Sequence, residues 1–236
     1  MFRDAWLVTK KDLLIELRSR ILINQIAPYT LLILVLFGFA LDADTETLRD
    51  TGPGLFWVST LLVAILAIQR SVDVETSDSA IDRLMLSGIS PISIYVGKTI
   101  GLYLQLIVLE ALLFTVMVVL FDMSVVDYPL VIVSAVVTTL AISSSGTLYG
   151  VIASGLGVRE TLLPVLFLPV LAPAVIGATR AFGDAFGRVN ADGWAWLGLL
   201  SVIAIVYTLV GMLTYCLLYT SPSPRDTILS RMPSSA

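Results

Sequence analysis

The sequence predicts an all-α membrane protein with six transmembrane helices and an amphipathic helix at the membrane surface near its N-terminus. The 236 residues are 57% hydrophobic and 14% charged, and the mean hydropathy is +0.95. Soluble domains are typically about 45–50% apolar and about 25% charged. A soluble core cannot absorb this much apolar surface, so lipid must solvate much of it.

The cysteine and histidine content argues against several kinds of site. The chain has one cysteine, Cys216, and no histidine. A single cysteine excludes an internal disulfide framework. The two counts together argue against a zinc site or a histidine-ligated haem iron, and the usual general base is missing. We therefore expect a scaffold or conduit that is not an enzyme, binds no cofactor itself and has no nucleic acid partner.

Residues 1–20 predict an amphipathic helix that lies in the membrane interface. At 100° per residue, four large apolar side chains fall on one stripe, bordered by basic side chains that can snorkel. The stripe consists of Phe2, Trp6, Leu13 and Leu17, and the basic residues are Arg3, Lys10 and Arg20. The alternative is an ordinary charged cytoplasmic end that happens to be helical.

Six apolar runs follow within residues 21–218, and most approach the roughly 20 residues that a spanning helix needs. The predicted spans are residues 21–41, 53–69, 99–121, 130–153, 162–178 and 194–218. Pro53 suits a helix start. The last stretch, residues 220–236, is rich in Ser and Pro, and the string CLLYTSPSPRD resembles a translated sequencing adapter. We expect this tail to be disordered and non-native.

Basic residues are distributed unevenly between the two sides of this topology. With the N-terminus inside, nine of them lie in inner segments: Arg3, Lys10, Lys11, Arg18, Arg20, Arg70, Arg83, Lys98 and Arg159. Three lie in outer loops: Arg49, Arg180 and Arg188. The positive-inside rule therefore predicts a cytoplasmic N-terminus and a cytoplasmic central loop at residues 70–98.

That central loop is the longest polar interruption of the chain and the predicted contact with a partner. Between Asp78 and Leu86, charged residues precede a Leu-Met-Leu patch, a pattern typical of a short amphipathic helix. The nearby Gly97-Lys98-Thr99 does not complete a Walker A motif, because position 92 is Ile where the motif requires Gly. The chain should not hydrolyse ATP, so ATP-driven transport would need another subunit.

Glu110 lies near the middle of the third predicted span. An acid there costs roughly 2.5–3.5 kcal/mol on insertion scales and is a functional hypothesis by default. A proton relay usually needs several such groups, and no other acid or base lies in the middle of a predicted span. The favoured alternative is a protonated or hydrogen-bonded side chain that contacts Ser, Thr or Tyr on a neighbouring helix.

Small residues and prolines mark the fourth and fifth spans. Gly146 and Gly150 form a GxxxG pair, which lets helix backbones approach closely, more plausibly within the chain than at a dimer seam. Pro164, Pro169 and Pro173 each remove a helical N–H and clash with the preceding turn. Three prolines predict a broken or re-entrant fifth span, with a kinked helix as the alternative.

Four stretches together resemble the CcmB family, the membrane subunit of the haem exporter of cytochrome c maturation, which is related to ABC-2-type permeases. They are residues 53–58 (PGLFWV), residues 80–86 (AIDRLML), Lys98 and residues 162–173 (LLPVLFLPVLAP). The resemblance covers residues 2 to 218. It implies an ABC-2 or type V exporter-like fold in the bacterial inner membrane. It also implies a complex with an ABC ATPase subunit, a second copy of this chain and haem-handling membrane subunits.

The resemblance implies that the central loop contacts the ATPase. The residues expected in that contact are Glu75, Asp78, Ile81, Asp82, Arg83, Leu84, Met85 and Leu86. The family often has Phe-x-x-Asp just after the second span, where this chain has VDVE at residues 72–75. With no His and one Cys, the chain offers little to bind iron. Haem is therefore expected as a substrate of the complex, held or released by a partner that carries histidines.

Two other functions remain open at this point. A stand-alone secondary transporter would need coupling-ion sites at mid-membrane and often has repeated halves. Glu110 is the one candidate for such a site, and the sequence has no clear internal repeat. A non-transporting assembly scaffold would share every feature described above.

Overall fold

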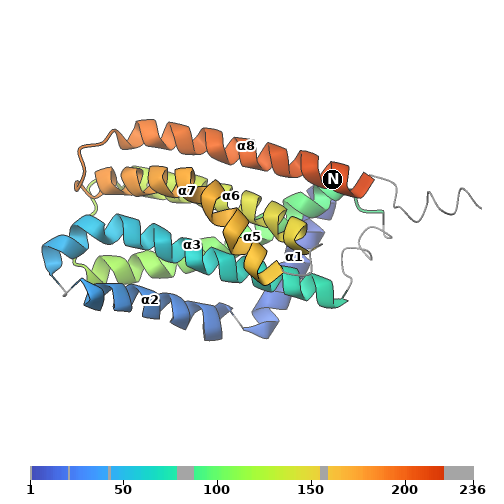
Figure 1. Cartoon of the computed structure of the whole chain (residues 1–236), viewed down its shortest axis with the longest axis horizontal. Helices are drawn as coiled ribbons and strands as arrows, with labels where there is room; N and C mark the ends of the chain where they lie inside the picture. Colours follow the sequence, from blue (N-terminus) through green and yellow to red (C-terminus); the bar gives the residue numbers. More distant parts are fainter. Residues whose placement is uncertain (1, 21, 42–43, 79–87, 155–158, 221–236) are drawn as a thin grey trace, which may run out of the picture.

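The computed structural model describes residues 2–20, 22–41, 44–78, 88–154 and 159–220. Every regular element within these ranges is helical, which confirms the predicted all-α class (Figure 1). The elements are α1 (Phe2–Ser19), the π-helix η1 (Leu22–Ile26), α2 (Ala27–Ala40), α3 (Thr45–Asp78), α5 (Pro91–Leu120), α6 (Tyr128–Ser154), α7 (Arg159–Ala185) and α8 (Gly193–Thr220).

Among the described residues, five helices are long and apolar enough to cross a membrane, namely α3, α5, α6, α7 and α8. The helices α1 and α2 form a pair bent by 54°, which counts as a sixth candidate if the pair is one broken span. Figure 1 shows α2, α3 and α5 to α8 gathered into one bundle, while α1 crosses its end. The chain is therefore a multi-pass membrane protein, as its composition predicts.

α1 packs on the bundle through a narrow face of small side chains. Ala5, Val8 and Thr9 are buried, whereas Trp6 is 59% exposed and Leu17 is 69% exposed. The apolar stripe predicted from the sequence therefore points mostly away from the protein. That outward face is available to lipid, as an interfacial helix requires.

Three helices extend well beyond their predicted boundaries, and α7 does so by continuing to Ala185 where the fifth span is predicted to end at residue 178. α3 begins at Thr45 and encloses Pro53, so the expectation that Pro53 starts this helix is wrong. α5 begins at Pro91, because the Ser90 side chain caps it by accepting a hydrogen bond from Ser93 N at 3.3 Å. The predicted loop at residues 70–98 is corrected accordingly, since α3 continues to Asp78 and α5 already contains residues 91–98.

The fifth span is a continuous helix that contains Pro164, Pro169 and Pro173, so the prediction of a broken or re-entrant segment is wrong. The helix instead bends partway along its length (Figure 1), as expected where prolines remove helical hydrogen bonds. Tyr207 on α8 supports this region by donating a hydrogen bond from its Oη to Val170 O at 2.5 Å. The kinked alternative therefore fits.

An aromatic cluster fixes the packing of three helices in the half of the bundle away from α1. Phe56 on α3 stacks on Phe182 of α7, with ring centroids 5.1 Å apart. The Phe56 ring also meets Phe114 of α5 edge-on at 6.3 Å, and Trp57 packs edge-on against Phe182 at 5.0 Å. The PGLFWV stretch of the sequence thus contributes core packing.

Candidate functional site

The candidate site is the end of the bundle that carries α1, which we call the α1 end. It comprises α1 itself, residues 68–78 of α3, residues 90–102 of α5, residues 144–151 of α6 and residues 207–215 of α8. Ser90 and Pro91 start α5 with a side-chain cap and a proline in the first turn. The first three turns of α5 are therefore firmly helical where the other elements converge on them.

The joint between α1 and α5 is a contact of backbone against backbone. A side-chain Cβ on Gly97 would lie 2.6 Å from Ala5 O and 2.7 Å from the Cβ of Val8, so only glycine fits there. Thr9 Oγ1 is 2.8 Å from Gly97 O and 3.0 Å from Ala5 O, and its hydroxyl bonds the two helices. The two helices therefore meet at this joint with no space for a further side chain.

A buried charge lies directly beside this joint. Lys98 follows Gly97 and is only 5% exposed. The Asp12 carboxylate on α1 attracts the Lys98 ammonium electrostatically, and it also pairs with Lys11 at 3.0 Å. Asp12 packs against Gly101, one turn further along α5. The two glycines of α5 thus admit α1 closely enough for the Asp12 carboxylate to act electrostatically on the buried Lys98.

A small pocket of about 20 Å³ lies next to Lys98, where α3, α5, α6 and α8 meet. Gly146 and Gly150 of α6 line it and contact α3 at Ile68 and Val72. The GxxxG pair thus packs within the chain. The full lining is Ile68, Ser71, Val72, Lys98, Leu102, Gly146, Thr147, Gly150, Val151 and Tyr215. A pocket of this size holds about one water molecule and no larger ligand.

Tyr95 connects the start of α5 to the other side of the bundle. Its hydroxyl donates a hydrogen bond to Ser144 O on α6 at 3.0 Å. Its ring packs against Tyr215 of α8, with centroids 5.0 Å apart, and it fills the space where Gly211 has no side chain. The start of α5 is therefore held between α1 on one side and α6 and α8 on the other.

Most of the predicted ATPase-contacting residues fall outside the part of the chain that the structure describes. These are Ile81, Asp82, Arg83, Leu84, Met85 and Leu86. Glu75 and Asp78 belong to the last turns of α3, but their side chains are likewise outside the described set. The structure does bring both ends of that segment to the α1 end, because α3 leads into it and α5 leads out of it.

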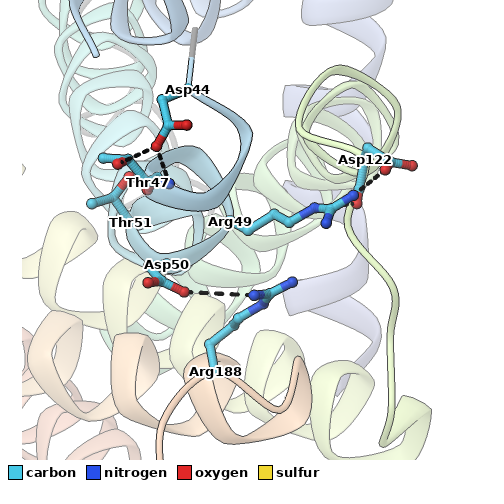
Figure 2. A network of polar contacts seen from close by, with 7 residues as sticks. All are labelled: Asp44, Thr47, Arg49, Asp50, Thr51, Asp122 and Arg188. Atoms are coloured by element: carbon cyan, nitrogen blue, oxygen red, sulfur yellow. Dashed lines mark hydrogen bonds and ion pairs between the residues drawn. The ribbon is translucent and has the colours of Figure 1, made fainter. Parts of the chain in front are cut away.

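The opposite end of the bundle is closed by polar contacts, and we call it the Arg49 end. It comprises residues 44–52, 121–127 and 184–193. Figure 2 shows Arg49 of α3 in an ion pair with Asp122, and Asp50 facing Arg188, whose Nη1 lies 3.7 Å from Asp50 Oδ1. Arg49 Nε also donates to Asp122 O at 2.9 Å. Adjacent residues of α3 thus form ion pairs with the α5–α6 connection and with the α7–α8 connection.

Asp44 starts α3 at the Arg49 end as a helix cap (Figure 2). Its Oδ2 accepts hydrogen bonds from Thr47 Oγ1 at 2.6 Å and from Thr47 N at 3.0 Å. These bonds favour the carboxylate and hold the pKa of Asp44 below its ordinary value of 3.8. The cap explains why α3 begins eight residues before Pro53.

Glu110 lies between the two ends, buried in α5 and only 4% exposed. Its Oε2 is 2.6 Å from Thr139 Oγ1 on α6. The predicted neighbouring hydroxyl is therefore present. Among the described residues, no cation forms an ion pair with Glu110.

The α1–α5 joint is not among the sequence-based predictions above. Gly97 and Gly101 form a GxxxG pair of their own, as Gly146 and Gly150 do, and that spacing was the available signal. The glycine of Gly97-Lys98-Thr99, which does not complete a Walker A motif, accommodates the close approach of α1.

Comparison with known proteins agrees with this architecture. A family model described as CcmB protein matches residues 3–216. A protein of Haemophilus influenzae named Heme exporter protein B is 25% identical over 199 residues, covering 84% of this chain and 90% of its own length. Proteins of the same name from Pseudomonas aeruginosa and Rhodobacter capsulatus are 24% and 28% identical, covering 75% and 71% of this chain and 80% and 74% of their own lengths.

Proposed function

The chain belongs to the CcmB protein family, and on that premise we propose that it is the membrane, or permease, subunit of an ABC-type complex. The complex would export or handle haem in c-type cytochrome biogenesis, in keeping with the name of the similar proteins. The observation that carries the proposal is the family match over nearly the whole membrane domain, residues 3–216.

In this proposal the chain transmits motion and leaves ATP hydrolysis to a partner ATPase subunit. The geometry at the α1 end supports this role. α3 and α5 flank the segment of residues 79–90, so a push on that segment reaches both helices directly. α5 passes the displacement to α1 through Gly97 and to α6 and α8 through Tyr95. Rigid, close-packed contacts of this kind transmit strain instead of absorbing it.

Haem is a substrate of the whole complex in this account, and the chain itself binds no iron. The sequence has no histidine, so in this proposal a haem-handling membrane partner supplies the histidine ligands that haem iron often takes. A second copy of this chain completes the membrane part. The complex lies in the bacterial inner membrane with the N-terminus and residues 79–90 in the cytoplasm, as the distribution of Lys and Arg favours.

Site-directed cross-linking of the assembled complex tests the predicted ATPase contact. Met85→Cys in a Cys216→Ser background, treated with a short thiol-to-amine cross-linker, should yield an adduct with the ATPase subunit. Val126→Cys is the matched control, because Val126 is exposed at the Arg49 end and should yield no such adduct. An ATPase adduct from Val126 but none from Met85 would reverse the proposed topology. If neither variant yields an adduct, the proposed contact between this chain and an ATPase subunit is wrong.

A further inference from the structure

Glu110 lies at a level of the bundle where buried hydroxyl groups from two neighbouring helices gather. Phe114 contacts Phe56 across α5 and α3, so Glu110, one turn before Phe114, is level with Thr60 in this antiparallel pair. α6 runs parallel to α3, and Gly146 and Gly150 contact Ile68. Thr60 precedes Ile68 by about two turns of α3, and residues 138–142 precede Gly146 and Gly150 by about two turns of α6. Thr60 is therefore level with residues 138–142.

The side chains at this level are removed from solvent. Thr60, Thr138 and Thr139 are buried, as is Glu110. Among the described residues, Glu110 Oε1 and the hydroxyls of Thr60 and Thr138 have no hydrogen-bond partner. Lys98 and Arg70 are about 18 Å and about 15 Å away along the helix axes, at 1.5 Å per residue. In the part of the chain that the structure describes, Glu110 therefore has hydroxyl groups at its level and no cation to balance a negative charge. Tyr103, about two turns earlier on α5, is the titratable side chain that interacts with it electrostatically.

Thr139 makes two short oxygen contacts but has a single hydroxyl hydrogen, and this decides whether Glu110 or Thr139 is the donor in the contact between them. Its Oγ1 is 2.6 Å from Glu110 Oε2 and 2.7 Å from Ala135 O on its own helix. Both distances are those of O–H···O hydrogen bonds, but a threonine hydroxyl has a single hydrogen to donate. If Thr139 donated to an ionised Glu110, its one hydrogen would have to serve both acceptors, and neither short contact would have a hydrogen of its own.

The other arrangement satisfies both contacts. A protonated Glu110 donates from Oε2 to Thr139 Oγ1, and Thr139 donates onward to Ala135 O. This arrangement also avoids burying an unpaired carboxylate, which costs far more than burying a neutral acid with one unpaired carbonyl oxygen.

We propose that Glu110 is a proton-binding site in the membrane interior, where it stays protonated at neutral pH and donates its proton to Thr139. The ligand of the site is the proton itself, and the hydrogen bond joins α5 to α6 halfway along the bundle. This inference concerns the chemistry of one side chain and does not depend on the proposed role in haem export.

Infrared spectroscopy of the intact purified chain in lipid nanodiscs tests the proposal. Exposed glutamates ionise with a midpoint of about pH 4.3, so at pH 7.5 only a protonated, buried carboxyl group of the protein gives a carboxylic-acid C=O band. That band should be present in the wild type and absent from Glu110→Gln. Thr139→Val should retain the band but shift it to higher frequency, because the acid loses its hydrogen-bond acceptor. Thr115→Val on an exposed face of α5 is the matched control and should leave the band unchanged.

Carboxylate bands at pH 7.5 in the difference between wild type and Glu110→Gln would overturn the proposal. An acid band that Thr139→Val does not shift would also overturn it, since Thr139 would then not accept the proton. If Glu110→Gln fails to fold, labelling the glutamate carboxyl groups of the wild type and Thr139→Val with carbon-13 gives the same answer. An acid band at pH 7.5 that moves with the label supports the proposal, and its absence contradicts it.

Discussion

The two ends of this helical bundle are held together by different kinds of contact. The α1 end depends on close packing at glycines, with Gly97 against the α1 backbone and Gly146 against the Ile68 side chain of α3. The Arg49 end also has buried apolar side chains, such as Phe121 and Phe186. It adds partly exposed ion pairs between connections, with Arg49 and Asp50 as the α3 partners. Close packing resists displacement, whereas exposed ion pairs are each worth about 0–1 kcal/mol and exchange readily with water. In the proposed coupling role, the close packing of the α1 end transmits the displacement, and the ion pairs of the Arg49 end add little resistance to it.

The largest expected effect comes from filling the α1–α5 joint. Gly97→Leu places a side chain where Ala5 O and Val8 already lie, and overpacking of this kind costs about 1–3 kcal/mol or more. We expect α1 to detach from α5, with a clear fall in thermal stability in detergent and loss of ATPase coupling in the complex.

Gly198→Leu is the matched control for that substitution, because nothing lies within 4 Å of a Cβ at Gly198 on α8. It should leave both the stability and the coupling close to wild type. Equal stability of the two variants would mean that α1 does not pack on Gly97 as described.

A smaller effect is expected from removing the single hydrogen bond across the same joint. Thr9→Val keeps the shape of the side chain but loses the bond from Thr9 Oγ1 to Gly97 O, so the unfolding free energy should fall by about 1 kcal/mol. Thr214→Val, which loses only a bond to Val210 O within α8, serves as the control. If Thr214→Val destabilises the protein as much as Thr9→Val does, the interhelical bond contributes nothing.

Removing a polar contact at the Arg49 end should lower the unfolding free energy less than removing the Thr9 hydrogen bond does. Arg49→Ala removes the ion pair with Asp122 and the bond to Asp122 O. Both are solvent-exposed, so the unfolding free energy should fall by less than about 1 kcal/mol, and added salt should shrink the difference. Arg180→Ala, an exposed arginine on α7, is the control. A loss at Arg49 larger than that of Thr9→Val would invert the contrast between the two ends.

The smallest expected effect is a pH dependence at Asp44. Its pKa is lowered in the folded state because Thr47 donates two hydrogen bonds to the carboxylate. A lowered pKa stabilises the fold above the unfolded value, and this stabilisation is lost as the pH falls through the lowered pKa. The unfolding temperature of Asp44→Ala should therefore lie below that of the wild type at neutral pH, and this difference should shrink well below pH 4. A difference that persists in acid would assign it to something other than the carboxylate.

The membrane fold could be predicted from the sequence, but the helix boundaries could not. Hydropathy identifies the part of a helix that crosses lipid, whereas the helix itself starts where backbone N–H groups are capped. Asp44 and Ser90 provide those caps outside the apolar runs. Similarly, three prolines predict a weakened helix, but the supporting bond from Tyr207 to Val170 O comes from a residue 37 positions away.

The candidate site was only partly predictable for a related reason. A glycine pair indicates close approach of two helices without identifying the partner. Gly146 and Gly150 were expected to pack within the chain, and their partners are Ile68 and Val72 of α3. The role of Gly97 depends on α1, which is nearly 90 residues away in sequence. The ATPase-contacting role of residues 75–86 stays a prediction.

The most direct test of the coupling role compares charge exchange at the two ends in the assembled complex. Asp82→Arg combined with Arg83→Asp exchanges two neighbouring charges in the predicted ATPase-contacting segment and keeps the net charge of the chain. Asp50→Arg combined with Arg188→Asp exchanges two charges at the Arg49 end, where the proposal expects no ATPase contact. ATP hydrolysis by the complex in nanodiscs is the measurement. We predict that the first exchange abolishes most of the coupled hydrolysis and that the second leaves it near wild type. Unchanged coupling and assembly in the Asp82 and Arg83 exchange would contradict the coupling role.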